Sequence, residues 1–188
     1  MLCVLGMATL ACGDHAAARV YVQESWALSH DAGMIWEAAN ALLGEGHVAF
    51  AERTVGVGIE CCQEALRCFV SLPSWDDRRR RVGLAACLAS LAGTISLAVP
   101  TIAARLFSVS AALRATVEPA TLQLFDVHYI LMGNRPANDV ALARVRANLG
   151  DAAFEAAWAA GQALTLDQAV AEAQELRADS PSLDSTTP

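Results

Sequence analysis

The most informative absence in the sequence is lysine, because all 13 basic residues are arginines. A P-loop and a Schiff-base enzyme each need a lysine, so both kinds of chemistry are excluded within this chain. Aromatic residues are scarce at 6%, and there are only 6 prolines and 12 glycines among 188 residues. Much of the 55% hydrophobic content is alanine, whose small side chain favours closely packed helices. The composition therefore predicts one all-α domain with a substantial core.

The net charge of −7 is unevenly distributed along the chain. Residues 1–70 carry a net charge of −5, residues 71–150 carry +4, and residues 151–188 carry −6. The basic middle segment is either a patch that binds a partner or a set of solvated and self-complementary helix faces. Because acidic segments lie on both sides of it, we expect no direct nucleic-acid binding by this chain.

The six cysteines lack the C-x₂-C spacing that zinc sites usually need. They fall inside apolar helical patterns, at Cys3, Cys12, Cys61, Cys62, Cys68 and Cys87. We therefore expect buried free thiols in a reducing compartment, with no metal and no cofactor. No basic residue precedes the apolar stretch from Met1 to Cys12, so the expected location is cytoplasmic.

Three segments of the chain resemble one another when Gly6, Gly46 and Gly93 are aligned. In each segment an apolar residue follows the glycine by two positions, a larger one by four, and an alanine by five. This spacing places one helix face against a neighbouring helix.

A second helix is expected after each of these segments, and it carries small or modest side chains at i, i+4 and i+7. The three sets are Ala18, Val22 and Ser25, then Gly58, Cys62 and Ala65, then Ala104, Ser108 and Ala111. Helix pairs that recur in this way are typical of an α-solenoid, whose units stack to bury their apolar faces. The sequence thus predicts an α-solenoid of antiparallel helix hairpins with a C-terminal helical cap.

The uncharged run from Leu84 to Ala104 permits a second interpretation of the central region. It has the length of a membrane span and follows four arginines. The repeat pattern explains the same residues as two helices of a protein without a membrane span, joined near Val99 and Pro100. A membrane-anchored helical protein is kept as the weaker alternative.

Turn-forming residues suggest where the helices end. Gly13-Asp14, Asp31-Ala32-Gly33 and Leu72-Pro73-Ser74 mark boundaries, whereas the second pair has Arg53-Thr54 in place of a Gly-Asp turn. Further helices are expected from Glu118 to Gly133, from Pro136 to Gly150, and after Asp151 as an N-cap, with Gly161 as a left-handed terminus. Thr165 to Gln168 has the spacing of a capping box.

These boundaries divide the chain into three parts. Residues 1–115 hold about three repeats, residues 116–176 form capping helices, and residues 177–188 are too polar to fold.

The repeats resemble tetratricopeptide units at Leu5-Gly6, Gly13-Asp14 and Ala18. The segments from Val145 to Gly161 and from Ala163 to Val170 are similar to the C-terminal ending of large bacterial signal-transduction ATPases and LuxR-type transcriptional regulators. This resemblance implies a sensor or interaction arm beside an ATPase or DNA-binding module. The sequence has no Walker motif and no recognisable DNA-reading helix, so the resemblance does not carry those activities to this chain.

Reactive side chains do not form a catalytic pattern in the sequence. Asp14-His15 and Asp126-Val127-His128 are isolated pairs, and residues one or two apart on a helix do not face each other. Cys61-Cys62 lies in an apolar helix, where burial makes a thiol inert. We therefore expect a protein that is not an enzyme.

Two groups of residues are candidates for binding a partner. Arg78, Arg79, Arg80 and Arg81 can bind oxyanions or an acidic surface, although Asp76-Asp77 favours local compensation. Trp36 and Trp75 lie near unit boundaries and are candidates for a binding groove, although aromatic residues in solenoids often fill gaps between helices.

The function predicted from the sequence is a non-catalytic scaffold or sensor arm in bacterial signalling or transcription regulation. Its expected partner is a protein, a peptide, or an adjoining ATPase or DNA-binding module. The alternative is a small-molecule sensor with a pocket near Trp36, His47 and Trp75.

Overall fold

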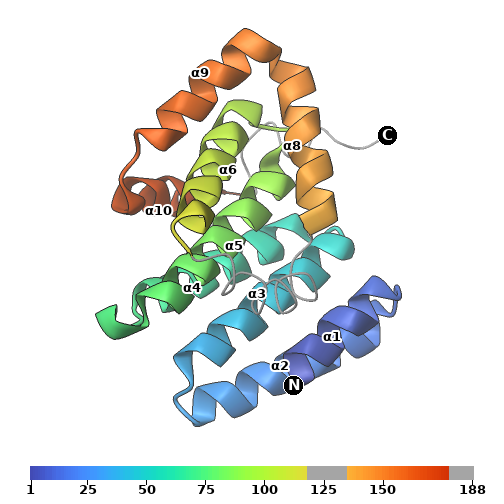
Figure 1. The fold of residues 1–188 in the computed structure, drawn as a ribbon. Coiled ribbons are helices and arrows are strands. Elements are labelled where there is room, and N and C mark those ends of the chain that lie inside the picture. Colours follow the sequence, from blue (N-terminus) through green and yellow to red (C-terminus); the bar gives the residue numbers. More distant parts are fainter. Residues whose placement is uncertain (118–134, 178–188) are drawn as a thin grey trace.

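The computed structural model describes residues 1–117 and 135–177, and within these ranges the chain is helical and contains no strand (Figure 1). The predicted all-α class is therefore confirmed. The helices are α1 (Leu2–Ala11), α2 (His15–Asp31), α3 (Ile35–Ala51), α4 (Val55–Val70), α5 (Asp77–Ile95), α6 (Pro100–Ala115), α8 (Arg135–Leu149), α9 (Asp151–Gln162) and α10 (Leu166–Gln174), with a short 3-10 helix at Ser74–Asp76.

Each helix from α1 to α6 packs against the next helix in the chain. This order changes in the C-terminal part, where α8 packs on α5 and α6, and α9 packs mainly on α6. The last helix, α10, returns to contact both α4 and α6 (Figure 1). The C-terminal helices thus cover one side of the helix series instead of extending it.

The turns follow the local chemistry of the sequence. Gly13 and Gly33 adopt positive φ angles of 85° and 67°, which glycine reaches without a steric penalty. Asp14 caps α2 by accepting a hydrogen bond from the backbone N–H of Ala17 at 3.0 Å. Between α3 and α4, where no glycine is present, Arg53 takes the left-handed conformation at φ 61°. The predicted boundaries in this part of the chain are confirmed.

The uncharged run from Leu84 to Ala104 is divided between two helices. α5 ends at Ile95, and α6 begins at Pro100, which needs no backbone N–H partner in the first turn of a helix. Among the helices that the structure describes, none is both long and apolar enough to cross a membrane.

The first two aligned glycines make the same kind of contact. A Cβ atom at Gly6 would lie 2.8 Å from Cγ1 of Val22, and a Cβ atom at Gly46 would lie 2.9 Å from Sγ of Cys62. Val22 and Cys62 are the equivalent positions of the two second helices predicted from the repeat. The α1–α2 and α3–α4 pairs therefore approach closely through matching residues, because glycine leaves room for the partner helix.

The third aligned glycine makes a different contact from the first two. A Cβ atom at Gly93 would lie 2.6 Å from Oδ1 of Asn138 on α8, and α8 is not its hairpin partner. Ser108 of α6 also faces away from α5, because its hydroxyl donates to the carbonyl of Trp158 at 2.8 Å. The helices α8 and α9 occupy the faces that a fourth hairpin would otherwise cover.

The C-terminal helices correct two predictions. Gly161 lies inside α9 and is not a left-handed terminus; a Cβ atom there would lie 2.5 Å from the Arg105 carbonyl oxygen. Gly150, at φ 74°, precedes α9, and Asp151 is the first helical residue, whose carboxylate accepts from Arg146 at 2.8 Å. The helix predicted between Glu118 and Gly133, with Asp126 and His128, lies outside the described residues, as does nearly all of the predicted tail.

The capping box at α10 is confirmed in both directions. The backbone N–H of Gln168 donates to Oγ1 of Thr165 at 3.2 Å, and the backbone N–H of Thr165 donates to Oε1 of Gln168 at 2.8 Å. Two backbone donors at the start of the helix are therefore satisfied by side chains.

The end of α10 is held by a side chain from α4. Nε2 of Gln63 donates to the carbonyl oxygens of Ala173 and Leu176, each at 3.0 Å. Nε2 of Gln174 donates in return to the Gln63 carbonyl at 2.9 Å. These bonds satisfy carbonyl groups that a helix end leaves without intrahelical partners.

The buried side chains form two clusters of unequal size. The larger runs from α3 to α10 and includes Phe69, Leu84 and Leu106. The smaller lies among α1, α2 and α3 and consists of Cys3, Met7, Ala18, Val22, Ala41 and Val48.

Candidate functional site

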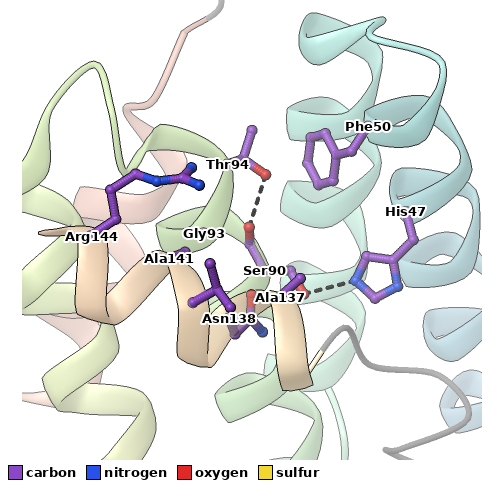
Figure 2. A pocket seen from close by; sticks show the side chains of 10 residues that line it. His47, Phe50, Ser90, Gly93, Thr94, Ala137, Asn138, Ala141 and Arg144 are labelled. Atoms are coloured by element: carbon purple, nitrogen blue, oxygen red, sulfur yellow. Dashed lines mark hydrogen bonds between the residues drawn. The ribbon is translucent and has the colours of Figure 1, made fainter.

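A cavity of about 510 Å³ lies where α3, α5 and α8 meet (Figure 2). The three helices contribute both polar and apolar side chains to its wall. The lining residues are His47, Phe50, Ser90, Gly93, Thr94, Ala137, Asn138, Val140, Ala141 and Arg144. Its size is in the range of pockets that hold small organic ligands.

Buried polar groups from α3 and α5 are bonded to each other at this cavity. Nε2 of His47 lies 2.9 Å from Oγ of Ser90, and both side chains are buried. The hydroxyl of Thr94 donates to the Ser90 carbonyl at 2.9 Å, one helical turn back (Figure 2). This network fixes the facing sides of α3 and α5.

A serine–histidine hydrogen bond is also a component of nucleophilic catalysis, but the position of Ser90 does not suit that role. Ser90 lies in the middle of α5, where backbone N–H groups are bonded within the helix. The catalytic arrangement needs free backbone donors beside the nucleophile to stabilise an oxyanion. We therefore interpret this bond as structural.

Asn138 brings a buried amide to the cavity from α8. Its side chain is 8% exposed, and its Nδ2 atom is buried with no hydrogen-bond partner among the described residues. The absence of a side chain at Gly93 lets the carboxamide lie directly against α5. A buried amide donor without a partner costs about 1–3 kcal/mol, so this atom is placed where a ligand acceptor would be favourable.

Arg144 is the one arginine among the described lining residues, which include no lysine and no carboxylate. It is exposed and forms no ion pair with any residue that the structure describes. Phe50, Val140 and Ala141 supply apolar surface between the polar groups. The arrangement can therefore bind a molecule with an apolar body and a negative charge.

Trp36 lies at a different cavity from His47. This second cavity, of about 450 Å³, is formed by α1, the end of α2 and the start of α3, and includes Met34 and Asn40 in its lining. The Trp36 side chain is only 8% exposed, and its ring packs against that of Phe69 with centroids 5.2 Å apart. Trp36 is thus mainly a core residue, and Trp36 and His47 line two separate cavities, whereas the sequence predicted one pocket near Trp36, His47 and Trp75. The side chain of Trp75 lies outside the described part of the structure.

Most of the arginine run is compensated locally. Arg80 and Arg81 donate to the carboxylate of Asp77 at 2.6 and 2.5 Å, and these bonds lower the pKa of Asp77. Arg79 lies 3.8 Å from Asp76 and places its guanidinium 5.8 Å from the Trp36 ring centre. Arg78 is exposed and forms no ion pair with another described residue. The structure therefore brings Arg79 and Trp36 together, while the four arginines do not form one shared site.

The six cysteines are all free and differ in exposure. Burial raises the pKa of Cys3 to about 12 and that of Cys61 to about 11, and it also raises the pKa of Cys87. These thiols are protonated at neutral pH and therefore poorly reactive. Cys12 is exposed, in contrast to the expectation of burial for all six. No group of potential metal ligands is found among the residues that the structure describes.

Sequence reasoning named His47 but missed Ser90, Asn138 and Arg144 as cavity residues. Each is an ordinary residue in its own helix, without a motif around it. The one usable signal was Gly93, whose missing side chain indicates a close approach by another part of the chain.

No family model and no solved structure matches the chain. The chain is similar to proteins of Mycobacterium tuberculosis, strain H37Rv, and Mycobacterium bovis, each with 28% identity over 176 residues. Both are named as candidate HTH-type transcriptional regulators. The matched region covers 94% of this chain but 18% of each relative, so the chain spans less than a fifth of the length of these proteins.

Proposed function

We propose that this chain is a non-catalytic helical-repeat arm that binds a protein or an adjoining module in bacterial transcription regulation. In this proposal the helices form a solenoid of tetratricopeptide-like hairpins closed by C-terminal capping helices. The arm acts through its conformation. A partner that binds one arrangement of the helices more tightly increases the population of that arrangement.

The observation that carries the proposal is the serial packing of α1 to α6, with a matching glycine contact in the first two hairpins. Gly6 faces Val22 and Gly46 faces Cys62, 40 residues later in each case. Repetition of one contact at a fixed interval is typical of repeat proteins, which present extended binding surfaces.

The similarity to candidate HTH-type regulators supports the regulatory part of the proposal. The chain matches 18% of the length of these relatives. In this proposal, DNA recognition belongs to another part of such a regulator. The sequence resemblance to regions beside LuxR-type DNA-binding modules and ATPases points in the same direction.

A site-specific photo-crosslinker at position 78 tests this proposal in the organism that makes the protein. Arg78 is exposed and outside local ion pairs, so its replacement leaves the fold intact. The expected product is a crosslink to a nucleotide-binding or DNA-binding regulatory protein or module, identified by mass spectrometry. The same crosslinker at the exposed position Ala143 of α8 is the matched control.

Two outcomes would contradict the proposal. One is a crosslinking pattern at position 78 that is the same as the pattern at position 143. The other is tight binding of the purified chain to a labelled DNA duplex, measured by fluorescence anisotropy at moderate salt, since this chain would then read DNA itself.

A further inference from the structure

The cavity between α3, α5 and α8 has two hydrogen-bond donors at separate points of one helix, of which the Asn138 amide is buried without a partner among the described residues. Asn138 and Arg144 are six residues apart on α8, which corresponds to about 9 Å along the helix axis. Asn138 offers a buried amide donor, and Arg144 offers an exposed guanidinium. Figure 2 shows the guanidinium extending toward Thr94, with the His47–Ser90 pair on the other side. A ligand that satisfies both groups needs an acceptor at each end.

The wall between these two groups is apolar. Phe50 approaches from α3, and Val140 and Ala141 lie on α8 between Asn138 and Arg144. Pockets for small organic molecules combine apolar walls with a few polar groups that fix the ligand's orientation. The body of the ligand is therefore apolar.

The charge of the lining selects an anion. Among the described lining residues there is no acidic side chain, and Arg144 forms no ion pair with another described residue. The whole chain carries a net charge of −7, which repels anions in general. An anion that binds here is therefore held by local contacts and not by the overall field of the protein.

We propose that this cavity binds a small organic carboxylate, with the carboxylate on Arg144, an apolar body along Phe50 and Val140, and a hydroxyl or carbonyl acceptor on the amide of Asn138. This site is independent of the proposed function as an interaction arm. The site depends only on the side chains of α3, α5 and α8 that line the cavity.

The test is a titration of the ¹⁵N-labelled protein with 4-hydroxybenzoate, followed by NMR. This probe has an acceptor at one end and a carboxylate at the other. We expect saturable shifts of the Asn138 side-chain amide and of the backbone amides of Gly93 and Ala141, with none in α1. The Asn138 side-chain signals are assigned by their loss in Asn138→Leu.

Two analogues separate the contributions of the two polar groups. 4-Hydroxybenzamide lacks the negative charge, and benzoate lacks the second acceptor. Arg144→Gln is expected to weaken binding of 4-hydroxybenzoate about tenfold or more, because a charge-assisted hydrogen bond is lost. Asn138→Leu is expected to weaken binding of 4-hydroxybenzoate more than that of benzoate.

Arg146→Gln is the matched control, since it removes the same charge from the same helix. Residues two apart on a helix do not face each other, and Arg146 contacts Asp151 and Glu155 on α9. The affinity of the Arg146→Gln variant for 4-hydroxybenzoate should equal that of the unmodified protein.

Three results would overturn the site. They are the absence of saturable shifts at millimolar probe in the folded protein, equal binding of the benzoate and benzamide forms, and equal weakening by Arg144→Gln and Arg146→Gln. Such a result together with a specific crosslink at position 78 would remove this site while leaving the proposed interaction arm intact.

Discussion

The backbone of Gly93 and the carboxamide of Asn138 are closer than any side chain at position 93 would allow. A Cβ atom there would lie 2.6 Å from Oδ1 of Asn138. The contact joins α5 to α8 across 45 residues of sequence, and it sets the position of the buried amide in the candidate site. Its consequences can be compared with those of a second close approach, at Gly161.

Gly161→Ala should destabilise the protein, while Gly93→Ala should not. A methyl group at position 161 meets the backbone of Arg105, 2.5 Å from its carbonyl oxygen, and backbone cannot rotate away. Overpacking of this kind costs about 1–3 kcal/mol, partly offset by the helix preference of alanine, about 1 kcal/mol. At position 93 the methyl group meets the end of the Asn138 side chain, which can rotate away where backbone cannot. Urea unfolding should show a net loss of up to roughly 2 kcal/mol for Gly161→Ala and none for Gly93→Ala. If both variants lose the same free energy of unfolding, the Asn138 side chain cannot move away from the added methyl group.

Gln63→Leu should lower the free energy of unfolding by about 1–3 kcal/mol, because it removes the side-chain donor that bonds the carbonyl group of Ala173 at the end of α10. The carbonyls of Gln174 and Leu176 also lose a bond from Gln63, but each still accepts from Arg177. Gln23→Leu is the control, since Gln23 is exposed and bonds only to Glu45. Thermal unfolding monitored by circular dichroism compares the two. Equal stability of the two variants would show that water replaces Gln63 without cost.

Asp77→Asn should change how the free energy of unfolding depends on pH in the acidic range. The bonds from Arg80 and Arg81 lower the pKa of Asp77 below 3.8 in the folded state. A lowered pKa means that the stabilisation is complete above the unfolded-state pKa and is lost as the pH falls through the folded-state pKa. The unmodified protein should therefore be more stable than Asp77→Asn at neutral pH, and the two curves should converge below pH 3.8. If the free energies of unfolding of the two proteins differ by the same amount at every pH, the ion pairs of Asp77 do not contribute to stability in this way.

Thiol labelling should distinguish Cys12 from the other cysteines. Cys12 is exposed, whereas burial raises the pKa of Cys3, Cys62 and Cys87. Because the thiolate is the reactive form, Cys12 should react first with a disulfide reagent under native conditions. Mass spectrometry of digested samples taken over time identifies the modified residue. Early labelling of Cys87 would require an opening of the larger core.

The helix boundaries of the first six helices could be predicted because they depend on local chemistry. The turns at Gly13 and Gly33 need a positive φ angle that glycine adopts easily. The start of α6 suits the fixed φ angle of Pro100. The contacts of Gly6 and Gly46 were also accessible, since hairpin partners are neighbours in sequence. In these cases the residues that decide the structure lie within about one repeat of one another.

The candidate site could not be predicted, because its parts come from α3, α5 and α8. Nothing in the sequence around Asn138 or Arg144 distinguishes them from surface residues of an amphipathic helix. Gly161 was misassigned for a related reason. A glycine near the end of an apolar helix fits both a left-handed terminus and a close helix contact, and only the presence of α6 selects the second.

The division of the interior into two clusters also implies that stability is graded along the molecule. The first two helices bury their side chains mainly in the small cluster with α3, whereas the other helices share the large one. In such an arrangement, the α1–α2 hairpin can open as a unit while the larger cluster stays closed. Amide hydrogens in α1 and α2 would then exchange with solvent well before those in α5, and a protease would find its earliest access at that end of the protein.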